Sequence, residues 1–210
     1  ARKLLQEGRL GKIYHMRAQY LQDWVMDPDY PLNWRLRKRT SGSGALGDLL
    51  SHTVDLARFL VGEIAEVSAM TETFIRRRPL EAAGPDGSGP QFGEVDVDDA
   101  VAVLARFENG ALGVFEATRF AGGNRNGNRF EINGSKGSLR WDLENMNLLH
   151  VYFNDDEKGL QGFRTINCTE AEHPYIEAYW PSGHIIGYEH TFINLVYELM
   201  NGIADGYSPE

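Results

Sequence analysis

The sequence predicts an α+β fold in which helices cover one face of a large, mostly antiparallel, open-faced sheet. Stretches that alternate between apolar and polar residues recur through the second half of the chain, separated by short turns. Two longer stretches repeat apolar residues with a helical period. The many strand–helix–strand crossovers typical of a doubly wound parallel sheet are absent from this pattern, so most strands are expected to pair as hairpins.

The first third of the chain predicts two helices, one strand and a loop. Residues 1–7 are expected to be helical, and residues 12–21 alternate as a half-buried strand does. Residues 27–33 contain two prolines and are expected to form a loop. A Gly-rich turn then leads into a helix over residues 44–62.

The remainder predicts a run of strands and a final helix. The expected strands cover residues 64–75, 97–107, 111–120, 129–133, 138–142, 148–153 and 163–168. Asn109-Gly110 is expected to close a hairpin, because both residues tolerate the positive φ of a type I′ turn. Residues 81–93 are rich in Gly and Pro and are expected to form a loop. The last helix is expected over residues 187–201, with an apolar face.

Composition restricts the class of partner. A net charge of -9 argues against nucleic acid, because affinity for a phosphate backbone comes from clustered Lys and Arg. The short run Arg76–Arg78 is interpreted as the solvated end of a strand. The sequence contains no apolar run of the roughly 20 residues that span a bilayer, and its single Cys168 fits a cytoplasmic protein. One domain over residues 1–210 is expected, cut from a longer polypeptide at both ends.

The helix over residues 44–62 carries a polar row opposite its apolar arc. On a helical wheel Asp48, His52 and Asp55 share one stripe, with Asp48 and His52 close enough to share a hydrogen bond. A solvated helix face, a metal site and an acid/base pair all fit this spacing. The metal site is the weakest of the three, because no further cluster of His or Cys accompanies the row. Spacing alone does not choose between the other two.

The residues around this row resemble a known family. The row lies within G-x-L-x-D-x-x-x-H-x-x-D, from Gly44 to Asp55, and Trp34-Arg35 precedes it. The segments INGSKGSLRWD and GHIIGYEHTFINLVYELMNGI follow in order. Together these motifs resemble the C-terminal domain of the glucose-fructose oxidoreductase/inositol dehydrogenase (Gfo/Idh/MocA) family over essentially the whole chain. The resemblance implies a substrate-binding domain that an N-terminal Rossmann domain would precede.

The resemblance also implies a reaction and roles for particular residues. Family members are NAD(P)-dependent and move a hydride to or from a carbon of a sugar, anhydrosugar or cyclitol. Asp48 and His52 match the catalytic pair, and Trp34 and Arg35 match residues that approach the NAD or NADP cofactor. No G-x-G-x-x-G following a strand and no E-K-P lysine occur in these 210 residues, so this chain alone is expected to be inactive. Asp55 is interpreted as structural.

Softer candidates for the substrate pocket lie in loops or at strand ends. The polar candidates are Gln22, Asn33, Arg125 and His184, and the aromatic ones are Tyr20, Trp24, Tyr179 and Trp180. The open sheet face is expected to form a homo-oligomer, with His15 as a sheet or interface residue. Two alternatives stay open: a non-catalytic module that only dimerises or docks through its sheet, and a metal-dependent hydrolase or lyase that uses His52.

Overall fold

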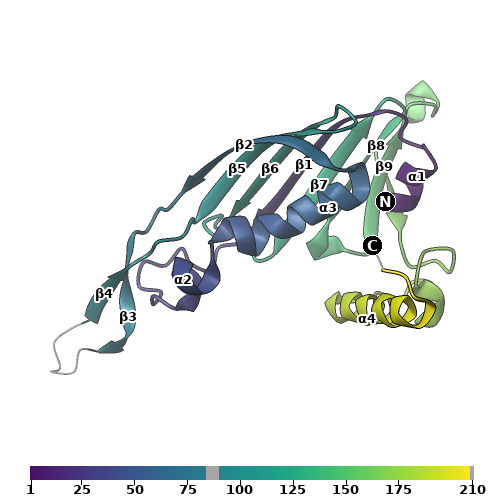
Figure 1. Ribbon diagram of the computed structural model, residues 1–210. Coiled ribbons are helices and arrows are strands. Elements are labelled where there is room, and N and C mark those ends of the chain that lie inside the picture. Colours follow the sequence, from purple (N-terminus) through teal and green to yellow (C-terminus); the bar gives the residue numbers. More distant parts are fainter. Residues whose placement is uncertain (84–89, 209–210) are drawn as a thin grey trace.

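The structure, a computed structural model, describes residues 1–83 and 90–208 and is built on one eight-stranded sheet (Figure 1). The strand order is β10-β9-β8-β7-β1-β6-β5-β2, and β3 and β4 form a separate hairpin. The sheet strands are β1 (Ile13–Leu21), β2 (Ile64–Glu72), β5 (Ala100–Phe107), β6 (Leu112–Thr118), β7 (Gly127–Gly134), β8 (Gly137–Asp142), β9 (Leu148–Phe153) and β10 (Arg164–Asn167). The α+β class and the large sheet are confirmed.

The first strand of the sequence lies in the middle of the sheet. β1 pairs in parallel with β6 and antiparallel with β7, and the other described pairs of the sheet are antiparallel. The sheet is therefore mostly antiparallel, as predicted, with one parallel pair at its centre. This arrangement places the end of β1 beside the end of β6, where the polar side chains described below gather.

The core lies between one face of the sheet and the helix α3 (Ser51–Val61), which crosses that face in Figure 1. A π-helical turn, η2 (Leu46–Leu50), precedes α3, so the predicted single helix is two joined segments. The predicted apolar arc is buried, as shown by the helix residues Leu49, Leu50, Thr53 and Ala57. On the sheet, inward and outward residues alternate along β5 and β6 as the period of two requires.

Two shorter helices accompany α3, and a long one closes the described chain. α1 (Arg2–Gln6) and α2 (Lys38–Ser41) flank it, and single 3-10 turns lie at Trp34–Leu36, Leu143–Asn145, Lys158–Leu160 and Ile176–Ala178. α4 (Tyr188–Asp205) is longer than the predicted final helix, and Gly202 is its only buried residue. Asn147 anchors the segment before α4 by hydrogen bonds in both directions with the backbone of Ile186. None of the helices in the described ranges has the length and apolarity that crossing a bilayer requires.

The predicted loop over residues 81–93 is partly wrong. β3 (Arg77–Ala83) and β4 (Pro90–Glu94) form a hairpin that extends beyond the sheet in Figure 1, and residues 84–89 lie outside the described ranges. A second apolar cluster supports this hairpin and overrides its Gly and Pro content. Its buried members are Val25, Leu32, Leu36, Val95 and Val97.

The interpretation of Arg76–Arg78 as a solvated run is wrong for Arg78. Arg76 and Arg77 are exposed, but Arg78 is fully buried. Its guanidinium donates to the carbonyl oxygens of Val25 and Asp27, the latter at 2.7 Å. Arg78 thus fastens the hairpin to the loop after β1, because backbone carbonyls replace the water that a buried cation loses.

Candidate functional site

Asp98 holds the start of the helical segment that carries the polar row. Its Oδ1 accepts the N–H of Gly44 at 2.8 Å, its Oδ2 accepts that of Leu46 at 2.6 Å, and its carbonyl accepts that of Ala45 at 3.0 Å. A carboxylate suits this place because the first N–H groups of a helix lack intrahelical partners. A Cβ on Gly44 would lie 1.7 Å from the Asp98 carbonyl oxygen, so the close approach requires glycine. The contact fixes where Asp48 stands.

Both carboxylate oxygens of Asp48 contact guanidinium groups. Oδ2 accepts a hydrogen bond from Nη2 of Arg119 at 2.7 Å, and Oδ1 accepts one from Nη1 of Arg35 at 3.4 Å. Asp48 and His52 make no hydrogen bond with each other in the described structure, contrary to the sequence-based expectation. A guanidinium is always charged and binds a carboxylate through strong charge-assisted hydrogen bonds, which explains the preference. We call Asp48, His52, Arg35 and Arg119 the Asp48 cluster.

His52 is exposed, and its ring makes a T-shaped contact with the ring of Tyr20. The two ring centroids are 5.8 Å apart at an interplanar angle of 61°. The Tyr20 hydroxyl donates to Oδ1 of Asn126 at 2.6 Å, and Gln22 Nε2 donates to the same oxygen at 3.1 Å. Trp24 Nε1 in turn donates to Oε1 of Gln22 at 2.9 Å. Burial raises the pKa of Tyr20, so its hydroxyl keeps its proton. At the end of β1, hydrogen bonds therefore fix a group of polar side chains near His52.

Trp34 and Arg35 lie at the edge of this cluster. Trp34 is 57% exposed, and the Arg35 guanidinium lies 4.7 Å from the centroid of its indole ring. Asn33 caps their short 3-10 turn, since its Oδ1 accepts the N–H of Arg35 at 3.0 Å and its Nδ2 donates to the Tyr30 hydroxyl at 2.7 Å. The structure thus brings Arg35 to Asp48 and uses both polar groups of Asn33 locally.

Arg125, His184 and Asp55 lie outside the Asp48 cluster. Arg125 is exposed and pairs with Asp23 at 3.2 Å. A ring nitrogen of His184 lies 2.7 Å from the carbonyl oxygen of Pro181, and none of its described contacts is with the Asp48 cluster. Asp55, which was interpreted as structural, is exposed on α3 and makes no side-chain hydrogen bond among the described residues.

Sequence reasoning missed Arg119 and Asn126. Along β6 the inward-facing positions are Gly113, Phe115 and Ala117, and Arg119 continues that series one position past the strand. The alternation, carried two residues further, indicates that Arg119 faces the interior. Asn126 lies in a loop, and no pattern in the sequence signals its contact with Tyr20.

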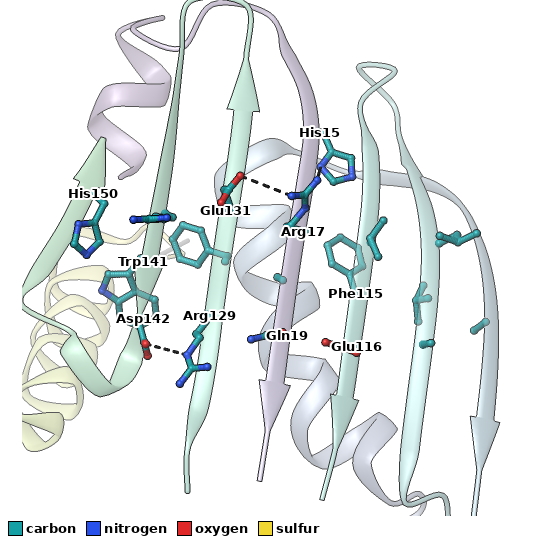
Figure 2. Close-up of a pocket in the computed structure, with 18 of the residues that line it drawn as sticks. His15, Arg17, Gln19, Phe115, Glu116, Arg129, Glu131, Trp141, Asp142 and His150 are labelled. Atoms are coloured by element: carbon teal, nitrogen blue, oxygen red, sulfur yellow. Dashed lines mark hydrogen bonds and ion pairs between the residues drawn. The ribbon is translucent and has the colours of Figure 1, made fainter. Parts of the chain in front are cut away.

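The opposite face of the sheet is uncovered and has a wide depression of about 900 Å³ (Figure 2). Charged side chains on β1, β7 and β8 pair across it, as Arg129 and Asp142 do at 2.9 Å. Apolar side chains lie beside them, including Met70 at 81% and Leu104 at 64% exposure. His15 is on this face, where burial and the nearby Arg17 lower its pKa. Among the residues that the structure describes, no three His, Cys, Asp or Glu side chains gather as a metal site would require.

Comparisons with known proteins match nearly the whole chain. A family model described as the GFO/IDH/MocA C-terminal domain matches residues 1–140. Levoglucosan dehydrogenase from Pseudarthrobacter phenanthrenivorans is 45% identical over 216 residues, which cover 99% of this chain and 55% of that protein. Myo-inositol 2-dehydrogenase from Thermotoga maritima is 37% identical over 163 residues, 78% of this chain and 42% of that protein.

Solved structures of oxidoreductases also match this chain over nearly its whole length. An oxidoreductase domain protein from Kribbella flavida has a TM-score of 0.95 and 53% identity, covering 100% of this chain and 55% of that one. Levoglucosan dehydrogenase in complex with NADH and L-sorbose has a TM-score of 0.92 and 45% identity, covering 99% and 54%. The chain therefore spans about half the length of the relatives it matches.

Proposed function

The chain belongs to the Gfo/Idh/MocA family, and from that premise we propose that it is the substrate-binding, catalytic-helix domain of an NAD(P)-dependent dehydrogenase acting on a sugar, anhydrosugar or cyclitol. The observation that carries the proposal is the Asp48 cluster, in which an anchored carboxylate lies one helical turn from an exposed imidazole. The dinucleotide-binding part would come from sequence outside these 210 residues.

His52 is the proposed proton acceptor. Removing a hydride from an alcohol carbon requires a base for the hydroxyl proton. The ring nitrogens of His52 make no hydrogen bond within the described structure, and Tyr20 braces the ring from one side. His52 is thus accessible to a substrate hydroxyl and held at a defined angle. In the reverse reaction the same imidazole returns the proton to the carbonyl oxygen.

Asp48 is proposed to orient the reacting hydroxyl. Its carboxylate is an acceptor already fixed by Arg119, so binding the hydroxyl costs little further side-chain entropy. Gln22 is the best-supported substrate ligand of the softer candidates, because Trp24 and Asn126 fix its amide next to the cluster. Similarity to levoglucosan dehydrogenase over 99% of the chain supports anhydrosugars as the first substrates to test.

Trp34 and Arg35 suit the edge of a nicotinamide cofactor. An exposed indole offers a flat apolar wall, and a guanidinium beside it suits a phosphate or a polarised amide. When bound, the cofactor supplies or accepts the hydride. The residues of this chain bind and orient the substrate and move the proton.

The test is a dehydrogenase assay of the full-length protein with NAD and NADP against levoglucosan, inositols and aldoses. His52→Ala and Asp48→Asn are each expected to lower turnover by about 10²-fold, the scale of a lost acid/base group. Asp55→Asn, exposed one turn further along α3, is the matched control and should keep wild-type turnover. Wild-type rates in the first two variants would refute the roles, and no activity with any substrate would refute the function.

The uncovered sheet face is proposed to pair with a second copy of the chain. Exposed apolar side chains on β2, β5 and β6 accompany the charged ones, and the described helices lie on the other face. Sheets with one apolar face commonly bury it against another layer, and closed homo-oligomers are the usual solution in symmetric assemblies.

A further inference from the structure

Arg119 is the most deeply buried charged group of the Asp48 cluster. Its side chain is 1% exposed, and its guanidinium carbon lies 5.2 Å from the ring centroid of Trp24. Its backbone N–H donates to the carbonyl of Asp99 at 3.1 Å, which ties it to the sheet. A group covered in this way cannot touch a substrate directly, so any effect on the reaction must pass through a neighbour.

The neighbour that Arg119 contacts is Asp48, and the contact is asymmetric. Arg119 holds Oδ2 at 2.7 Å from a buried position, while Arg35 reaches Oδ1 at 3.4 Å and is 42% exposed. Water and ligands compete readily for the longer, exposed contact and not for the short, buried one. The Asp48 carboxylate therefore has one anchored oxygen and one that a ligand can take.

The two charges also depend on each other. Nε and Nη1 of Arg119 have no hydrogen-bond partner among the described residues, so in that part of the chain the ion pair with Asp48 is what compensates this buried cation. An unpaired buried charge is costly, which favours the arrangement with Oδ2 bound. Displacing either member would therefore leave the other without its charge partner.

We propose that Arg119 is a positioning residue for the dehydrogenase reaction: it anchors Oδ2 of Asp48 so that Oδ1 is left to receive the substrate hydroxyl. The inference rests on the proposed function of Asp48. Arg119 neither binds substrate nor transfers a proton, and its whole effect on turnover is expected to pass through the Asp48 carboxylate.

The experiment is a double-mutant cycle in the full-length enzyme, with kcat and KM measured separately. Arg119→Gln should lower kcat about 10- to 100-fold, the scale of a misplaced catalytic group, with a smaller change in KM. The double variant Arg119→Gln/Asp48→Asn should be no slower than Asp48→Asn alone, because the anchor has nothing left to hold. Arg119→Lys should restore part of kcat, since an ammonium keeps the charge without the fork.

Arg78→Gln is the matched control. Arg78 is equally buried, but the hydrogen bonds of its guanidinium go to backbone carbonyls of the loop after β1, and none goes to Asp48. Its effect should therefore multiply with that of Asp48→Asn. Circular dichroism establishes whether each variant is folded. If Arg119→Gln does not fold, Arg119→Lys takes its place in the double-mutant cycle.

The outcomes distinguish the positioning role of Arg119 from the proposed role of Asp48. Wild-type kcat in a folded Arg119→Gln enzyme would overturn the inference, as would a loss that multiplies with that of Asp48→Asn. If Asp48→Asn itself keeps full turnover, the proposed role of Asp48 fails first. If Asp48→Asn is impaired and Arg119→Gln is not, only the positioning role is overturned.

Discussion

Adding one methyl group to Gly44 should disrupt the start of the helical segment that carries Asp48. The new Cβ of Gly44→Ala would lie 1.7 Å from the carbonyl oxygen of Asp98 and 2.7 Å from its carbonyl carbon. Non-bonded heavy atoms are comfortable at about 3.5 Å, so the two segments must separate by well over an ångström. Because the obstacle is backbone, no side-chain rotation relieves it.

The separation should cost about 3 kcal/mol of unfolding free energy. It breaks the hydrogen bonds from Gly44 and Leu46 to the Asp98 carboxylate, and a bond to a charged group is worth about 1.5–3 kcal/mol. For a chain of this size that corresponds to a melting temperature lower by roughly 6–12 °C. Asp48 should move as well, because its N–H donates to the carbonyl of Gly44 at 3.0 Å.

Urea denaturation and thermal melting measure this effect. Gly159→Ala is the matched control, because a Cβ there meets nothing within 4 Å, and we expect a change within about 0.5 kcal/mol. If Gly44→Ala unfolds within the same margin of wild type, the close approach between Gly44 and Asp98 does not hold the helix start, and the explanation for the position of Asp48 is wrong.

Three further predictions concern other parts of the molecule. Burial raises the pKa of Asp99 above its usual 3.8, so the stability that protonated Asp99 contributes at low pH is lost as pH rises through the folded-state pKa. Asp99→Asn should therefore reduce the fall in unfolding free energy over that pH range. If the unfolding free energy falls with pH as steeply as in the wild type, the raised pKa of Asp99 is not its cause. Leu104→Asp on the uncovered sheet face should shift the full-length protein toward monomers by light scattering, and an unchanged mass would exclude that face as the interface. Tyr20→Phe should lose about 1 kcal/mol with its bond to Asn126 and keep most of kcat because the ring still braces His52; a hundredfold loss would mean that the hydroxyl takes part in the reaction.

Secondary structure was predictable where the alternation or helical period of apolar residues matches the face that packs on the core. The alternation in residues 100–118 predicted β5 and β6, because each strand has one face on the core. The apolar arc of the helix likewise predicted which side of α3 is buried, and therefore that Asp48 and His52 lie away from the core.

Contacts between distant segments were not predictable in this way. Arg78 was interpreted as an ordinary strand-end cation, and Arg119 was not singled out; only the folded chain shows that carbonyl oxygens and Asp48 compensate their burial. The β3–β4 hairpin was missed because its stability comes from an apolar cluster shared with residues 25–36, which local Gly and Pro content does not reveal. The bond between Asp48 and Arg119 joins residues on two elements, and spacing within one helix says nothing of it.

The central place of β1 has a consequence for how the chain acquires its fold. Met16 pairs with Gly113 on one side and Ile132 on the other, so β1 can pair only after partners about a hundred residues later in the sequence have been synthesised. The β5–β6 and β7–β8–β9 meanders have only local contacts to make and should form first. Insertion of β1 between them would then be the slow step, and until it occurs two unpaired strand edges face each other in the nascent protein. Substitutions in β1 are therefore expected to slow folding as well as to lower stability.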